Sequence, residues 1–275
     1  MLRGPTRQDG EHHMAKAYER IADDLRQRIR AGELKSGDRL PAETKLVDQY
    51  RKSLPTVRQA LGVLQAEGLI EKLHGRGNVV RKPRRLVTRT NGRHQWEKDR
   101  ARQSLDERQQ TGATEHDTGL TISDLVFSAE FSEVEADEDL AEAFGVPAGT
   151  RLLERVYRTR YREEEAPFNV SRSRLLYDMA SANPALLDVA HEPWPGGTQN
   201  QLHSIGIEVA RVVERVTARP PTFEESEELG LTAGVAVMVL RKTCVDTEGR
   251  VVEVADVTLP GDRTELEFTT PLGRW

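Results

Sequence analysis

The feature that most constrains the fold is a run of three short segments with apolar residues at helical spacing, followed by a glycine-rich turn. Residues 17–31 repeat apolar side chains at that spacing, from Tyr18 to Ile29. A second short helix is predicted after the Leu40-Pro41 pair, because proline is typical of a helix boundary. Both segments are amphipathic and too short to form a core alone, so we expect them to pack together.

A third helix is predicted to begin after Ser53. Its hydroxyl can accept hydrogen bonds from the free N–H groups at a helix start, and Pro55 is tolerated in that first turn. Two short apolar runs then flank a His-Gly-Arg-Gly turn at residues 74–77, which is typical of a β-hairpin. Three helices and a hairpin in this order predict a winged helix-turn-helix.

The third helix of such a domain fits the major groove of DNA. Its exposed residues near the N-terminus, here Thr56, Arg58 and Gln59, can reach base edges or phosphates. A glycine-rich hairpin tip has little side-chain bulk and can enter the minor groove, where Arg76 suits the negative potential. The alternative for Arg58 is a solvated or internally paired helix arginine.

Four strings stand out in this segment: GDRLPAE at 37–43, TVRQAL at 56–61, LQAEGLI at 64–70 and HGRGNVV at 74–80. They resemble the DNA-binding domain of the GntR family of bacterial transcription regulators. The chain departs from the usual family pattern at Thr44 and at Leu54, which cannot make the family's arginine contact, so its operator is expected to differ from common family sites. The predicted DNA-binding residues are Lys45, Ser53, Thr56, Arg58, Gln59, His74, Gly75, Arg76 and Gly77.

The chain has 275 residues and a net charge of −5, but its two parts carry opposite charge. Residues 1–102 contain 24 Lys and Arg against 13 Asp and Glu, whereas residues 103–275 contain 16 against 32. A basic module gains free energy on a polyanion by releasing counterions, and an acidic module is repelled from it. This asymmetry favours nucleic acid as the partner of the first part; the alternative is two solvated surfaces that merely differ.

Several classes of protein are excluded by composition. No apolar run approaches the ~20 residues that cross a bilayer, and the first residues are polar throughout, so we expect a cytoplasmic protein without membrane contact. Cys244 has no second cysteine for a disulfide or a structural zinc site. The sequence contains no G-x-S-x-G, H-E-x-x-H or P-loop string. We expect no catalytic site, no metal and no cofactor.

We expect three regions: a winged helix-turn-helix at 14–82, an interdomain linker at 83–118 and an α+β domain at 119–275. The linker has mixed charge and few apolar residues, and it is long for a connection inside one domain. An additional small helix over residues 95–110 is equally compatible with its sequence.

The acidic part contains a weak duplication. Residues 144–159 and 229–243 share a Gly-x-x-Ala-Gly run, and each copy follows an acidic helix candidate and precedes a charged turn and a second strand candidate. Helix, strand, turn and strand therefore occur twice. Connections this short give hairpins, so we predict two similar halves around a mostly antiparallel sheet.

Polar side chains share faces of the first predicted hairpin, because strand residues alternate between faces. Arg158 and Arg160 share one face of the outgoing strand, and Asn169 and Ser171 share one face of the return strand. Two arginines suit an anionic ligand, and hydroxyl groups suit hydroxyls or amines. The alternative is an exposed sheet face with ion pairs.

The Gly-x-x-Ala-Gly run, the R-x-R pattern at 158–160, and the runs at 246–253 and 261–263 resemble the UTRA effector-binding domain, whose fold is similar to that of chorismate lyase. The whole chain resembles the HutC subfamily of GntR regulators. In that family the R-x-R arginines, a Ser-x-Tyr at a helix start and a glutamate of the last hairpin bind the ligand; here Thr-Gln-Asn at 198–200 replaces Ser-x-Tyr. The predicted effector-binding residues are Arg158, Arg160, Asn169, Ser171, Thr198, Asn200 and Glu253.

The leading hypothesis is a homodimeric repressor. Two winged domains would bind the half-sites of a near-palindromic double-stranded operator, and a polar or anionic small molecule in the C-terminal domain would modulate the affinity. Two alternatives stay open. One is a ligand-independent control repressor of a mobile element, whose pocket has decayed, and the other is a lyase-like enzyme acting on a small carboxylate, for which no acid–base pair can be named.

Overall fold

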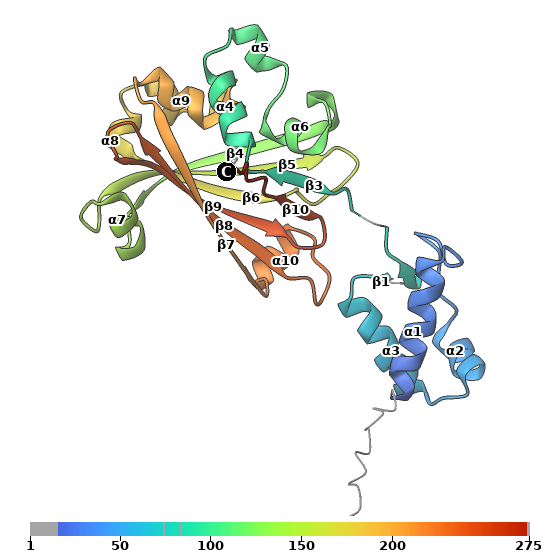
Figure 1. Cartoon of the computed structure of the whole chain (residues 1–275). Helices are drawn as coiled ribbons and strands as arrows, with labels where there is room; N and C mark the ends of the chain where they lie inside the picture. The colour runs from blue at the N-terminus through green and yellow to red at the C-terminus, as the bar shows by residue number, and fades with distance from the viewer. Residues whose placement is uncertain (1–15, 74, 83, 274–275) are drawn as a thin grey trace, which may run out of the picture. The chain divides into compact units, whose positions relative to one another are not determined.

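The computed structural model describes residues 16–73, 75–82 and 84–273. They form two compact units, and along the chain the second unit begins at Arg84 (Figure 1). Each unit has its own hydrophobic core.

The N-terminal unit has the predicted order of three helices and a hairpin. The helices are α1 (Ala17–Arg30), α2 (Glu43–Tyr50) and α3 (Leu54–Ala66). The strands β1 (Ile70–Leu73) and β2 (Gly77–Val80) pair antiparallel. Arg39 adds an isolated antiparallel bridge to Val79, so the segment before α2 lies along the outer side of the hairpin.

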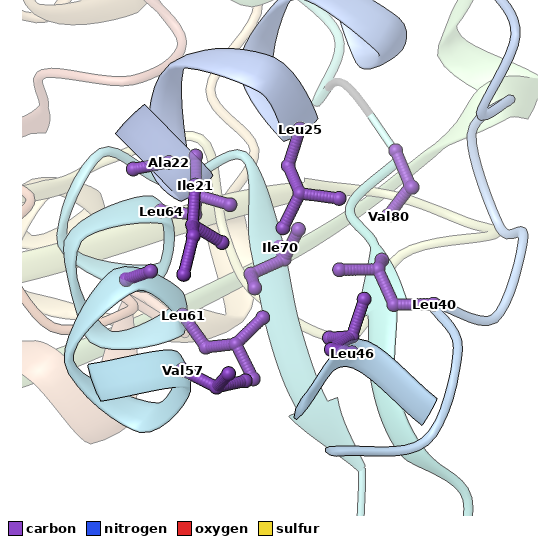
Figure 2. Packing of buried hydrophobic residues seen from close by; sticks show 11 residues of the cluster. Ile21, Ala22, Leu25, Leu40, Leu46, Val57, Leu61, Leu64, Ile70 and Val80 are labelled. Carbon is purple, nitrogen blue, oxygen red and sulfur yellow. The ribbon is translucent and has the colours of Figure 1, made fainter. Parts of the chain in front are cut away.

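The core of this unit joins all three helices to the hairpin. Figure 2 shows Leu25 of α1, Leu46 of α2 and Leu64 of α3 gathered around Ile70 of β1. Each of these four side chains is completely buried, which contributes about 1.5–3 kcal/mol per side chain. The periodic apolar residues of the three helices all face this core. Their spacing in the sequence therefore predicts that the helices pack together.

The C-terminal unit is built on one six-stranded sheet in which every neighbouring pair is antiparallel. In spatial order the strands are β4 (Leu125–Glu135), β5 (Arg151–Tyr161), β6 (Val170–Leu176), β9 (Val251–Pro260), β8 (Val237–Asp246) and β7 (Val209–Arg219). A winged helix-turn-helix followed by an α+β domain with a largely antiparallel sheet is the predicted fold class, which is confirmed.

The strand order shows the duplication directly. Strands β4, β5 and β6 form one half of the sheet, strands β7, β8 and β9 form the other, and the halves meet where β6 pairs with β9. Helix α7 (Glu138–Phe144) connects β4 to β5, and helix α10 (Phe223–Glu228) connects β7 to β8 at the equivalent place. The two halves of the predicted repeat are therefore related about the centre of the sheet.

The segment expected to be a linker differs in the structure. From residue 84 onward it belongs to the C-terminal unit, as β3 (Val87–Thr90), α4 (Arg93–Ala101), α5 (Leu105–Gln109) and α6 (Ala113–Thr118). Strand β3 pairs in parallel with β10 (Thr264–Glu267), and Val87 packs with Leu125 and Phe168. Helix α4 buries Arg93 and Arg100, so no apolar period marks it in the sequence.

The remaining elements are short. They are η1 (Ile122–Asp124), α8 (Tyr177–Ala180), η2 (Pro184–Leu187), η3 (Val189–His191) and α9 (Gly197–Ser204). Helix α9 packs against α4. Among the described residues, the structure contains no helix with both the length and the apolar character needed to span a bilayer.

Candidate DNA interface and effector cavity

The N-terminus of α3 is fixed by the cap that the sequence predicts. Ser53 Oγ accepts a hydrogen bond from the Thr56 N–H at 3.5 Å and lies 2.8 Å from Thr56 Oγ1. This cap satisfies a backbone donor that has no partner within the helix. Val57 faces the core, whereas Arg58 and Gln59 are exposed. The helix therefore presents the side chains that sequence reasoning assigned to DNA.

Arg58 is held at the surface by the neighbouring helix. Its Nε donates to Glu43 Oε2 of α2 at 2.7 Å, while 63% of its side chain stays exposed. An exposed pair of this kind contributes about 0–1 kcal/mol, so a DNA phosphate can compete for the guanidinium. Lys45 is exposed on the same helix as Glu43.

The hairpin turn has the backbone that its glycines allow. Gly75 and Gly77 have φ values of 72° and 82°, in the left-handed region that side chains disfavour. Arg76 between them is exposed. His74 lies outside the described residues. Sequence reasoning missed Arg39, whose guanidinium lies beside Gly77, 3.6 Å from where a Cβ would stand, and which adds a basic group to this turn.

A cavity of about 190 Å³ lies in the C-terminal unit, between one face of the sheet and the segment from β3 to α6. The sheet provides Tyr157, Ser171 and Lys242. The covering segment provides charged groups from β3, α4 and α6. These are Arg89, Arg93, His94, Glu97 and Asp117.

Three of the predicted effector residues line this cavity: Asn169, Ser171 and Thr198. Asn200 does not line it, because its buried amide donates to the Ala101 carbonyl at 2.7 Å and accepts from Trp194 Nε1 at 2.8 Å. Of the two residues that replace Ser and Tyr of Ser-x-Tyr, Thr198 therefore lines the cavity and Asn200 joins α9 to α4.

Arg158 and Arg160 lie on the opposite face of β5 from the cavity. Tyr157 lines the cavity, and neighbouring residues on a strand point to opposite faces. Arg158 instead pairs with Glu228 and with Glu130, and Arg160 donates to the carbonyl oxygens of the turn after β5. The expected pairing of the two arginines on one face is correct, but the cavity occupies the other face.

Glu253 belongs to a buried network on the cavity side of the sheet. Its carboxylate accepts from Ser173 Oγ at 2.6 Å and lies 2.8 Å from Lys242 Nζ and 3.4 Å from Arg155 Nη2. Cys244, a core residue, donates its thiol to the same carboxylate at 3.2 Å. Burial alone would raise the pKa of Glu253, but the charges of Lys242 and Arg155 outweigh it and lower that pKa to about 2.

The charges above the cavity are arranged around Arg93. Its guanidinium pairs with Asp117 of α6 and, at 3.2 Å, with Glu97 one turn later on α4. His94 lies 3.4 Å from Glu97 and 2.9 Å from Glu214 of β7. Burial opposes the charged imidazole, but the two carboxylates outweigh it and raise the pKa of His94. Among the described residues, no group of acidic, histidine and cysteine side chains could hold a metal ion.

Two protein families match this chain, one in each of its two parts. Residues 17–80 match the bacterial regulatory proteins of the gntR family, and residues 128–265, half of the chain, match the UTRA domain. The chain belongs to the GntR family, with a UTRA domain. The predicted resemblance is confirmed in both parts.

Relatives of this GntR protein extend over nearly its whole length. The transcriptional repressor NagR of Bacillus subtilis is 26% identical over 260 residues, 90% of this chain and 91% of NagR. The histidine utilization repressor of Klebsiella aerogenes is 24% identical and covers 92% of this chain and 94% of its own. A solved structure titled as a putative GntR-family transcriptional regulator is 26% identical, with a TM-score of 0.61, over 94% of this chain and 98% of that one.

Sequence reasoning missed the cavity-lining groups of this GntR protein that come from the expected linker. Arg89 and Arg93 line the cavity, and both lie in a stretch whose polar composition indicates an exposed connection. Their i, i+4 spacing is a weak signal, because β3 ends between them. Lys242 was also missed, although it lies on β8, the strand of the second half of the repeat that corresponds to β5 in the first half.

Proposed function

We propose that this GntR-family chain is a homodimeric transcriptional repressor, acting in the cytoplasm without catalysing a reaction. Each N-terminal unit binds one half-site of a near-palindromic operator. A small polar or anionic molecule in the cavity of the C-terminal unit changes the affinity for DNA. The observation that carries the proposal is an α3 with its N-terminus capped and its arginine exposed, in one chain with a cavity lined by charged side chains.

The DNA contacts follow from exposure and charge. Arg58, Gln59 and Thr56 stand at the start of α3, the end that enters the major groove in helix-turn-helix proteins. Arg76 and Arg39 are exposed beside the glycine turn of the hairpin, where a basic group suits the minor groove. One such module gives mostly salt-sensitive affinity for phosphates, so specificity requires two modules on two half-sites.

The effector contacts are assigned to the cavity rather than to the opposite face of β5. Asn169, Ser171 and Thr198 offer amide and hydroxyl groups, and Lys242 and Arg93 offer positive charge. A ligand shifts the balance between two states of the protein only if it binds one of them more tightly. The cavity wall includes Arg89, only five residues after the start of the unit at Arg84, so ligand contacts act close to the chain connection between the units.

The test of the DNA assignment is binding of the full chain to the DNA upstream of its own gene. Fluorescence anisotropy titrations at several salt concentrations, with unrelated competitor DNA, separate specific from electrostatic binding. We expect nanomolar, competitor-resistant binding, and we expect Arg58→Ala to abolish it. Arg172→Ala removes an exposed arginine of the other unit and is the matched control. Equal affinity of Arg58→Ala and the unchanged protein at moderate salt would refute the assignment.

A further inference from the structure

Arg89 of β3 is a buried cation with a poor partner. Its side chain is 10% exposed and lines the cavity. Its sole ion pair among the described residues is with Glu214, at 3.8 Å, and no hydrogen bond to its guanidinium is found there. Buried guanidinium groups normally make several short hydrogen bonds to carboxylates, because removing the charge from water is costly.

The acidic groups near Arg89 are engaged elsewhere. Glu97 and Asp117 pair with Arg93. The carboxylate of Glu214 lies 2.9 Å from the imidazole of His94 and 3.8 Å from the guanidinium of Arg89. Burial, with the repulsion of Arg93, lowers the pKa of Arg89 to about 10. Arg93 itself has a buried Nε without a hydrogen-bond partner. The cavity therefore has unused donors on its β3 and α4 side.

The rest of the wall indicates what can reach those donors. Val87, Phe127, Phe168 and Val257 give the cavity apolar and aromatic surface, next to the hydroxyl groups of Ser171 and Thr198. Its volume of about 190 Å³ lies below the roughly 300–1,000 Å³ of typical ligand pockets, so the occupant is small. Two other cations of the wall are already paired: Arg93 with Glu97 and Asp117, and Lys242 with Glu253. Arg89 can therefore match one negative charge, and a dianion such as a phosphate ester would bring a second charge without a partner.

We propose that the effector is a small organic monocarboxylate with an apolar body, and that Arg89 binds its carboxylate. Arg89 then gains the close anionic partner that it lacks, and the apolar body packs against the aromatic wall. This inference rests on the proposed function, since it names the ligand class and the anchoring residue of the same cavity. It assigns to β3 the role that the sequence predicted for Arg158 and Arg160.

The experiment measures ligand binding to the full chain by calorimetry and by thermal shift. The probes are acetate, benzoate and phenylacetate, with benzamide as the neutral analogue of benzoate and inorganic phosphate as the dianion, all at constant ionic strength. We expect saturable binding of an aromatic acid at least tenfold tighter than that of benzamide or phosphate. Acids that bind no more tightly than benzamide, or phosphate that binds more tightly than every acid, would overturn the proposal.

Variants identify the anchor. Arg89→Gln is expected to weaken binding of the preferred acid at least tenfold, and Arg89→Lys, which keeps the charge without the planar fork, is expected to fall between. Arg172→Gln is the matched control, because Arg172 also lies 3.8 Å from a carboxylate, that of Glu154, but has a 46% exposed side chain. Arg89→Met removes a poorly paired buried charge, so its melting temperature should equal or exceed that of the unchanged protein. Undiminished acid binding by Arg89→Gln would overturn the assignment.

Failure of this inference differs from failure of the proposed function. Specific DNA binding together with no preference for acids rejects the carboxylate alone. The opposite result is acid binding that depends on Arg89 without specific DNA binding, with or without the acid. It would support Arg89 as the residue that binds the carboxylate and would reject the function as a repressor.

Discussion

Arginine does three different things in this chain, and its surroundings decide which. Arg58 is exposed and weakly paired, so it can exchange its partner for a phosphate. Arg89 is buried with one distant carboxylate, so it can accept an anionic ligand. Arg155 is completely buried, and Gln201, Ser173 and Glu253 satisfy its terminal nitrogens, so it holds the sheet and α9 together.

Replacement of Glu253 should be strongly destabilising. Glu253→Gln leaves the completely buried Arg155, and the half-buried Lys242 beside it, without the negative charge between them, and breaking a buried pair costs about 3–5 kcal/mol. Urea unfolding followed by circular dichroism measures the loss. Glu133→Gln is the control: Glu133 pairs with Arg151 and both side chains are 53% exposed, so its loss should stay within about 1 kcal/mol. Equal losses would contradict the prediction.

The same carboxylate gives a pH dependence with a definite sign. Its pKa falls from 4.5 to about 2 on folding. The ionised form therefore contributes stability that is complete above pH 4.5 and is lost as the pH falls toward 2. Urea midpoints between pH 6 and 2 should show the difference between the unchanged protein and Glu253→Gln shrinking through that window. A difference that stays constant would show that the charge of Glu253 is not its source.

At the scale of elements, the N-terminal helices could be predicted well, whereas a helix over residues 95–110, where α4 and α5 lie, was only one of two open interpretations and α6 was not predicted. The apolar period of α1 and α3 corresponds to their buried faces, with Ile21 and Leu25 inside one and Leu61 and Leu64 inside the other. Helix α4 has Arg93 and Arg100 at its buried positions, where their charges meet carboxylates and a carbonyl from elsewhere in the unit. Local sequence carries no sign of partners that distant, so a polar segment is interpreted as exposed.

The cap of α3 should matter for both stability and DNA binding. Ser53→Ala removes the hydroxyl that accepts the Thr56 N–H, which costs about 1 kcal/mol, and lets the start of the helix fray where it meets DNA. Thermal unfolding and operator titrations measure the two effects. Ser104→Ala removes the equivalent cap of α5, where Ser104 Oγ accepts the Glu107 N–H at 3.4 Å. That control should lose similar stability in its own unit and keep full operator affinity.

At the scale of the whole molecule, the proposed dimer makes a geometric prediction about its operator. Two recognition helices related by a two-fold axis contact half-sites whose centres are about 10–10.5 base pairs apart, or a multiple of that distance. Insertion of about five base pairs between the half-sites turns one of them to the far side of the duplex. We expect affinity in anisotropy titrations to fall to that of a single half-site, and about ten inserted base pairs to restore part of it. Insensitivity to the spacer would argue against a dimer with fixed half-sites.

The sequence by itself determined the winged helix-turn-helix, its capped third helix and the duplicated sheet. Those features depend on neighbours close in the chain: apolar periods, a cap at Ser53 and short turns between strands. Tertiary structure alone decided which face of the sheet carries the cavity. Alternation along β5 places Tyr157 and Arg158 on opposite faces of the sheet, but only the packing of residues 87–118 over one face forms the cavity there. The alternation of strand residues assigns each side chain to one of the two faces of the sheet. Which face forms a cavity depends on the segment that packs over it, and that segment is separate from the strand in the sequence.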